Sequence, residues 1–387
     1  MIPAVLNISE VKKMANILMI NVPYAGHTNP TLPLTQALVK KGHKVVYINA
    51  EECRDKIEKT GAKFVPYQNF PNSPTEQEKK VKCFRAAFDT ALNLNEKFDI
   101  LIYEMFFYPG IEVARRLGMP CVRQFSQPAW SEKTVSKASF QFHLSCLLID
   151  MQVMGRENKR HMNLVNKTLK TAIVNDKPTL NIVYVPQAFQ LDRETFGDDY
   201  LFTIPKWEIV TSSQQIPYEQ MKPPIVYISL GSIISNRGFC KECIRAFGNK
   251  EMSIILNTGK IKPESLKKIP ANIYAYSFVP QIEVLQHADV FLTHCGMNSV
   301  NEAISFGVAM VAMPFVNDQA SNAKRIVELG IGKKVRSFPS SGKQLYNTVK
   351  SVYEDKEIRK RCAEIQGKLK GETTLKESVD RIEELIR

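Results

Sequence analysis

Side chains that could donate hydrogen bonds to an anion gather between residues 278 and 319. A short apolar run at 290–293 predicts a buried strand, and a helix is expected to begin near Asn298, after a tight turn that contains Gly296. The free N–H groups of such a turn and the positive end of the helix dipole favour an anion. Glu302, one helical turn after Asn298, offers a carboxylate that suits ribose hydroxyls. The stretch therefore predicts a site for a nucleotide diphosphate. Three further side chains there could donate to phosphate oxygens: His294, Asn298 and Ser299.

A second reactive side chain, His27, follows an apolar run at 17–22 that predicts a parallel strand. Asn29 and Pro30 then predict a helix start, and the helix is expected to continue to about Lys41. This order places His27 at the carboxyl edge of a sheet, where open α/β sheets bind ligands. An imidazole with a pKa near ~6.5 suits general-base chemistry, whereas a capping or core histidine is the alternative. The absence of a Gly-x-Gly-x-x-Gly segment argues against a dinucleotide-binding domain.

The order of residues in the first stretch resembles the donor-binding signature of nucleotide-sugar glycosyltransferases. These are the GT-B enzymes of glycosyltransferase family 1, and the form at 294–299, His-x-Gly-Met-Asn-Ser, is that of the bacterial macrolide-type branch. Phe278 and Met297 stand where plant members carry Trp, so the base of the donor nucleotide stays open. The positions that carry the resemblance are Phe278, Pro280, Gln281, Leu285, His287, Thr293, His294, Cys295, Gly296, Asn298, Ser299, Glu302, Gly307, Pro314, Asp318 and Gln319.

The resemblance also implies roles in donor binding. Ser232, in the Gly231-Ser232 turn after an expected strand, would donate to the donor phosphates, with an ordinary helix-capping serine as the alternative. The polar pair Asp318 and Gln319, expected at the end of a loop, would hold the hydroxyls of the sugar. The remaining donor contacts are expected from Phe278, Val279, Gln281, His294, Gly296, Asn298, Ser299 and Glu302.

The segment Gly26-His27-Thr28-Asn29-Pro30 resembles the catalytic-histidine loop of the same family. Glu104 ends an expected strand at 98–104, where the family commonly has an Asp that orients the catalytic histidine. A carboxylate on the far ring nitrogen fixes the tautomer and stabilises the imidazolium that forms. The resemblance therefore implies that His27 is the general base and that Glu104 is its partner. A solvated carboxylate at a strand end is the alternative for Glu104.

The resemblance further implies an α/β protein with the GT-B fold. Two Rossmann-like domains with parallel sheets would face each other, and a C-terminal helix would cross back to the N-terminal domain. We expect an acceptor-binding domain at 1–208, a proline-containing linker at 209–224, a nucleotide-sugar-binding domain at 225–370 and the crossover helix at 371–387.

Apolar side chains in the first half could line an acceptor cleft above His27. Core packing is the alternative for each of them, since apolar residues at helical spacing more often pack in a core. For the same reason Phe140, Phe142 and Met151 are expected in the core. The candidates for the acceptor cleft are Phe84, Phe88, Met105, Phe106, Phe107 and Trp130.

The composition fits a globular protein of two domains: 387 residues, of which 44% are hydrophobic and 24% charged. We expect no transmembrane segment, because no apolar run reaches about 18 residues, and we expect no secretory signal before the first strand. A cytoplasmic protein with eight reduced cysteines follows. The net charge of +13 is shared by both halves without a basic tail. This argues against a nucleic-acid partner and leaves a weak contact with a membrane surface open.

The expected reaction is the transfer of glucose from UDP-glucose to a hydroxyl of a small apolar acceptor, such as a macrolide or a flavonoid, with inversion at the sugar. The expected partners are therefore the nucleotide-sugar donor and a small-molecule acceptor. We expect no cofactor besides this co-substrate and no metal, because no Asp-x-Asp motif lies near the site. Three alternatives stay open: a lipid glycosyltransferase at a membrane surface, a nucleotide-sugar epimerase, and a binding protein without turnover.

Overall fold

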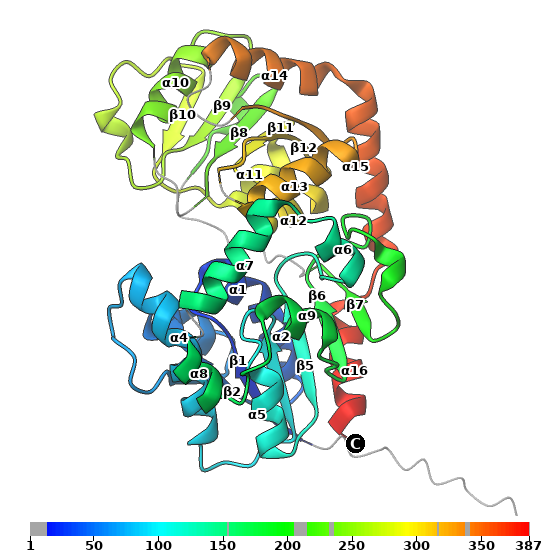
Figure 1. Ribbon diagram of the computed structural model, residues 1–387. Helices are drawn as coiled ribbons and strands as arrows, with labels where there is room; N and C mark the ends of the chain where they lie inside the picture. Colours follow the sequence, from blue (N-terminus) through cyan, green and yellow to red (C-terminus); the bar gives the residue numbers. More distant parts are fainter. Residues whose placement is uncertain are drawn as a thin grey trace, which may run out of the picture.

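The computed structural model describes residues 14–152, 155–204, 215–231, 236–315, 317–336 and 341–386. Within these ranges the chain forms two parallel sheets, one from each half of the sequence, and helices cover both (Figure 1). We call the part around the first sheet the N-terminal lobe and the part around the second the C-terminal lobe. The predicted α/β fold with parallel sheets is confirmed.

The sheet of the N-terminal lobe has seven described strands in the order β3-β2-β1-β4-β5-β6-β7. Its strands are short apolar runs, as expected for parallel strands that are buried on both faces. The strand order reverses between β1 and β4, and ligands bind beside such switch points at the carboxyl ends of the strands. The strands are β1 Asn16–Ile20, β2 Lys44–Asn49, β3 Lys63–Pro66, β4 Ile100–Glu104, β5 Cys121–Phe125, β6 Leu180–Val183 and β7 Tyr200–Phe202.

The chain after β1 differs from the single helix predicted from Asn29. It forms a short helix α1 at Ala25–Thr28, a 3-10 turn at Asn29–Thr31 and then α2 at Leu32–Lys40. Pro30 has no N–H to donate to an earlier carbonyl, so the helical path changes there. His27 thus lies in a helical turn and not in an open loop. The other helices of the lobe are α3 Arg54–Glu58, α4 Glu76–Leu92, α5 Gly110–Leu117, α6 Glu132–Ser136, α7 Phe140–Gln152, α8 Arg156–His161 and α9 Leu169–Asn175.

The sheet of the C-terminal lobe has six described strands in the order β10-β9-β8-β11-β12-β13, with its switch point between β8 and β11. Asp318 and Gln319 lie in the first turn of α13 and not in a loop, because an acidic side chain suits the positive end of a helix. The strands are β8 Ile225–Ser229, β9 Ser253–Asn257, β10 Ile273–Tyr276, β11 Val290–Thr293, β12 Ala309–Ala312 and β13 Gly332–Lys334. The helices are α10 Arg237–Phe247, α11 Gln281–His287, α12 Met297–Ser305, α13 Asn317–Glu328, α14 Gly342–Glu354 and α15 Lys356–Lys368.

The last helix, α16 at Leu375–Ile386, returns to the N-terminal lobe, as predicted (Figure 1). Val379 and Ile382 are buried in the same apolar cluster as Leu34 and Leu38 of α2. At the edge of this contact, Glu383 accepts a hydrogen bond from the ring of His43 over 3.1 Å. Burial of this apolar face holds α16 on the N-terminal lobe, although in the chain α16 follows the C-terminal lobe.

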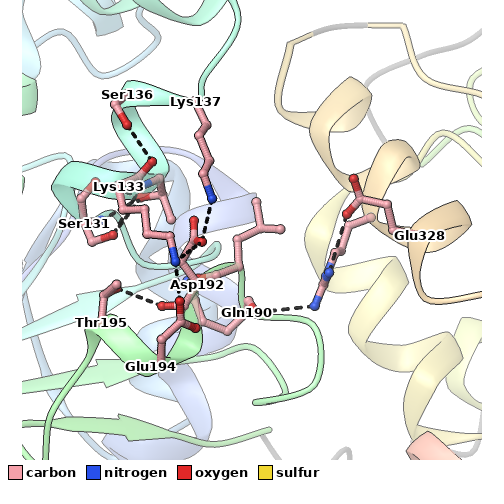
Figure 2. Close-up of polar contacts among 12 residues, drawn as sticks. Ser131, Lys133, Ser136, Lys137, Gln190, Asp192, Glu194, Thr195 and Glu328 are labelled. Carbon is pink, nitrogen blue, oxygen red and sulfur yellow. Dashed lines mark hydrogen bonds and ion pairs between the residues drawn. The ribbon is translucent and has the colours of Figure 1, made fainter.

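Polar contacts also join the two lobes beside β6. Arg325 of α13 donates to the carbonyl oxygens of Ala188 and Phe189 over 2.9 and 3.0 Å. The same segment is held to α6 by Asp192, which lies 2.8 Å from Lys137 and 3.0 Å from Lys133 (Figure 2). The segment after β6 is therefore tied to both lobes at one flank of the interface between them.

Candidate active site

The ring of His27 is held by two side chains from the carboxyl edge of the first sheet. His27 Nδ1 lies 2.9 Å from Oε1 of Glu104, the last residue of β4. It also lies 2.8 Å from the hydroxyl of Ser126, the residue after β5. Glu104 is fully buried, whereas the side chain of His27 keeps 24% of its surface exposed. The sheet therefore brings the predicted pair together, with one exposed edge of the imidazole.

The hydrogen bonds around Glu104 determine which nitrogen of His27 carries the proton. The Ser126 hydroxyl donates to Oε1 of Glu104 over 3.0 Å, and the Phe106 N–H donates to Oε2 over 2.8 Å. With the Ser126 proton engaged by the carboxylate, His27 Nδ1 is left as the donor in this cluster. The Nε2 atom is then the unprotonated nitrogen, which is the form that a base requires.

The pKa of His27 reflects two opposing effects. Burial lowers the pKa, but the charge of Glu104 and its hydrogen bond to the ring raise it by more, so that it lies above the usual 6.5. The carboxylate of Asp318 adds to the rise from the C-terminal lobe. The site thus stabilises an imidazolium, which is the product of proton abstraction by this side chain.

The turn after β11 brings the predicted anion site to α1, the helical turn that contains His27. The side-chain amide of Asn298, at the start of α12, donates to the carbonyl oxygen of Gly26 over 3.4 Å. The Oδ1 atom of Asn298 is buried and has no hydrogen-bond partner among the described residues. The N-terminus of α12 and His27 therefore face each other across the interface between the lobes, an arrangement that would suit a group transfer between two bound substrates.

His294 lies between two glycines. A Cβ atom on Gly231 or on Gly296 would come within 2.6 Å of the His294 ring, so neither position has room for a side chain. Gly231 also has φ +76°, which favours glycine. Burial lowers the pKa of His294 to about 4, so the ring is neutral at pH 7 and can donate one N–H. Nδ1 has no partner among the described side chains.

The other predicted donor residues form a hydrogen-bonded group on α11 and α12. Gln281 donates to the Ser299 hydroxyl over 3.0 Å and to the carboxylate of Glu302, and it accepts from Tyr227 over 2.9 Å. Burial raises the pKa of Glu302 to about 7. The expected ribose contact would therefore use a carboxylate that Gln281 already orients.

The remaining donor candidates differ in exposure. Phe278 is 69% exposed, as a platform for a base would be, whereas Val279 is 2% exposed and belongs to the core. Asp318 is exposed, but Gln319 is largely buried and accepts the Phe315 N–H over 2.9 Å. Ser232 lies outside the described residues.

A path of aromatic rings leads away from His27. The ring of Phe106 lies 5.0 Å from that of His27, Trp130 lies 6.1 Å from Phe106, and Phe142 lies 4.8 Å from Trp130. Phe106 and Trp130 are partly exposed and are placed to contact an apolar acceptor. For the other four acceptor candidates the alternative holds, because they pack in the buried core: Phe84, Phe88, Met105 and Phe107.

Ser126 is the residue of this site that the sequence analysis missed. It directly follows strand β5, which lies next to β4 in the sheet. The signal for Ser126 in the sequence was its type and position: it is a small polar residue at the carboxyl end of a predicted strand, and the preceding predicted strand ends in Glu104. In the described part of the chain, no three His, Cys, Asp or Glu side chains gather where they could hold a metal ion.

Solved structures of glycosyltransferases share this architecture. The glycotransferase of kitacinnamycin has a TM-score of 0.82 and 23% identity, covering 97% of this chain and 100% of that one. CalG4, the calicheamicin glycosyltransferase, has a TM-score of 0.80 and 23% identity, with 97% and 98% covered. The two facing lobes and the returning α16 thus define a GT-B glycosyltransferase fold.

Sequence comparison then gives the family. NDP-glycosyltransferase YjiC of Bacillus subtilis (strain 168) is 31% identical, over 92% of this chain and 94% of that protein. Oleandomycin glycosyltransferase of Streptomyces antibioticus is 25% identical, over 95% and 90%. Residues 217–366 match the family described as UDP-glucoronosyl and UDP-glucosyl transferase. The chain belongs to this family of GT-B enzymes, glycosyltransferase family 1, and it transfers a sugar from a nucleotide sugar to an acceptor. No described helix has the length and the apolar character needed to cross a bilayer.

Proposed function

We propose that this enzyme transfers glucose from UDP-glucose to a hydroxyl of a small, largely apolar acceptor, with inversion at the sugar and with His27 as the general base. The observation that carries the proposal is the arrangement of His27, Glu104 and Ser126, in which Nδ1 is engaged and Nε2 is left to accept a proton. The family description, which names UDP-glucosyl transferases, supports the donor.

His27 would act on the acceptor hydroxyl as the new bond to the anomeric carbon forms. Nε2 takes the hydroxyl proton, and the ring becomes positively charged beside the buried carboxylate of Glu104. This charge is formed only as the reaction proceeds, so its stabilisation lowers the barrier more than it strengthens substrate binding. The hydroxyl oxygen replaces the diphosphate oxygen in one displacement, and an α-linked donor sugar therefore gives a β-glycoside.

The C-terminal lobe would stabilise the leaving UDP. Its diphosphate gains negative charge as the glycosidic bond breaks, and the N-terminus of α12 directs free N–H groups and a positive dipole end at that position. The neutral His294 ring can donate one N–H there, the side-chain amide of Asn298 has a second N–H besides the one that it gives to Gly26, and Ser232 is expected to add a hydroxyl. Asp318 and Gln319 would hold the sugar hydroxyls. Because these neutral donors supply the stabilisation, we expect no requirement for a divalent metal.

Phe106 and Trp130 support an apolar acceptor, because both rings are partly exposed on the route that leads from His27. Relatives named for natural products agree with this class: one is an oleandomycin glycosyltransferase and another, from Streptomyces fradiae, is a demethyllactenocin mycarosyltransferase. Macrolides and flavonoids carry hydroxyl groups on large apolar frames, and they are the acceptors that we would test first.

The test is UDP release from UDP-glucose with a panel of macrolide and phenolic acceptors, in the presence of a chelator, with the product's anomeric configuration determined by NMR. We expect acceptor-dependent release and a β-glycoside. His27→Ala should lose nearly all release while still binding UDP. His161→Ala is the matched control, since His161 also pairs with a carboxylate, Asp89, but lies outside the site. Release that persists in His27→Ala, or an α-glycoside, would contradict the proposal.

A further inference from the structure

Helix α7 carries an apolar face that is exposed to solvent. Residues of an α-helix follow one another at about 100°, and five large apolar side chains of α7 fall within one sector of about this width. Their exposed fractions range from 42% to 81%. This corrects the expectation that Phe140 and Met151 pack in the core. We call the five residues the α7 stripe: Phe140, Leu144, Leu147, Leu148 and Met151.

The α7 stripe points away from the site around His27. Phe142 lies on the opposite side of the helix, half a turn from the centre of the stripe, and its ring contacts Trp130 on the aromatic path to His27. Cys146 and Asp150 of the same side are buried. The inner face of α7 therefore packs on the lobe beside the acceptor route, and the outer face is available for a different contact.

The surroundings of the α7 stripe are basic. Residues 132–177, which contain α6 to α9, have eight Lys and Arg and four Asp and Glu. The one carboxylate on α7, Asp150, is buried and accepts hydrogen bonds from the Tyr108 hydroxyl and the Leu169 N–H. Lys170 lies 3.0 Å from the His143 ring beside the stripe, and Arg156 and Arg160 follow α7 in the exposed helix α8. Within the described ranges these three cations have no carboxylate in ion-pair distance.

Charge, and not size, indicates the occupant of the stripe. At these exposures five large side chains present on the order of 500 Å² of apolar surface, an area that either a protein partner or a membrane could cover. Helix α7 carries no exposed carboxylate, and the cations beside it, Arg156, Arg160 and Lys170, complement the negative headgroups of an anionic bilayer.

We propose that the α7 stripe docks this enzyme onto an anionic phospholipid membrane, with the stripe in the acyl region and the cations of 156–170 at the headgroups. The proposal concerns where the enzyme works and does not depend on the sugar that it transfers or on His27. An apolar acceptor would partition into the same membrane, and it could then reach His27 along the rings of Phe142, Trp130 and Phe106.

The test is flotation of the full chain with vesicles of phosphatidylcholine, with and without phosphatidylglycerol, at physiological salt. We expect binding to the anionic vesicles, weaker binding to the neutral ones, and a loss of about tenfold or more in Leu147→Gln/Met151→Gln. The matched control is Leu117→Gln/Val327→Gln, which changes two exposed apolar residues on other helices. Arg156→Gln/Arg160→Gln should lower binding to the anionic vesicles alone.

Thermal unfolding and UDP binding should be unchanged in all three double variants, since none touches the site. Absence of binding by the wild-type chain would overturn the proposal, as would equal binding of the wild type and Leu147→Gln/Met151→Gln. Equal binding to neutral and anionic vesicles would overturn the electrostatic part. A dimer in light scattering that Leu147→Gln/Met151→Gln converts to a monomer would assign the stripe to a second copy of the chain instead.

Discussion

The side-chain amide of Asn298 donates to the carbonyl oxygen of Gly26 over 3.4 Å, although 272 positions separate the two residues. Asn298 lies in the first turn of α12, the helix proposed to bind the donor diphosphate, and Gly26 precedes the proposed base. The side chain of Asn298 thus belongs to the anion site of the C-terminal lobe and also contacts the backbone next to His27 in the N-terminal lobe. Occupation of the donor site and the position of His27 are therefore physically linked.

Asn298→Ala should weaken UDP binding by about threefold to tenfold, the effect of losing one or two hydrogen bonds. It should also lower kcat, because the contact with the His27 loop is lost. Calorimetric titration with UDP and steady-state kinetics measure the two effects. Ser305→Ala is the control, since its hydroxyl bonds to Asn301 at the far end of the same helix. Unchanged UDP affinity in Asn298→Ala would show that Asn298 does not contact the donor.

Glu104→Gln should lower kcat by about a hundredfold or more, because the imidazolium of His27 loses its carboxylate. The pH profile should move as well. Activity requires neutral His27, and Glu104 raises the pKa of that ring, so its removal should shift the acidic limb of kcat/KM to lower pH. Asp89→Asn, at the remote pair with His161, is the control and should keep the wild-type profile. An acidic limb that stays in place would exclude Glu104 as the partner.

Ser126→Ala should lower kcat by about fivefold to thirtyfold with little change in the KM for the donor, since the hydroxyl orients the ring and does not reach the nucleotide. The acidic limb of the pH profile should shift too, because the bond from Ser126 to Glu104 is lost. Ser126→Thr keeps the hydroxyl and should restore most of the rate. Failure of Thr to restore it, with a normal pH profile in the Ala variant, would indicate a packing role only.

The resemblance to glycosyltransferase family 1 predicts the pairing of His27 with Glu104, and the apolar runs at 17–22 and 98–104 place both residues at one edge of a parallel sheet. The helix start after His27 was misplaced, since the 3-10 turn at Pro30 depends on the packing of Thr28 and Thr31 beneath it. Ser126 escaped because a hydroxyl after a strand also fits an ordinary turn, and only the strand order places it beside Glu104.

Exposure was the property that the sequence could not give. The apolar spacing of α7 predicts a buried helix, yet this helix is apolar on both sides and the fold covers one of them. The same limit applies to the acceptor candidates. Phe106 and Phe107 are neighbours of one type, but the first faces the His27 ring and the second lies in the core.

Gly231→Ala should destabilise the fold by about 1–3 kcal/mol, because the new Cβ would meet the His294 ring and the backbone has a positive φ. UDP affinity should fall with it, since the His294 ring must move. Chemical denaturation and UDP titration measure the two effects. Gly367→Ala, in the last turn of α15 with open space around it, is the control and should be neutral or slightly stabilising. Normal stability and affinity in Gly231→Ala would show that the ring is not confined.

Glu302 should make stability depend on pH. Burial raises its pKa from 4.5 to about 7 in the folded protein, so the folded state holds this proton more tightly than the unfolded chain does. The resulting stabilisation is complete below the unfolded pKa and is lost as pH rises through 7, a change on the order of 2 kcal/mol between pH 5 and 8. Glu302→Gln cannot ionise, so the difference in unfolding free energy between variant and wild type should move in favour of the variant over this range. Denaturation curves at a series of pH values measure this difference. A constant difference between variant and wild type from pH 5 to 8 would show that Glu302 is already ionised in the folded protein.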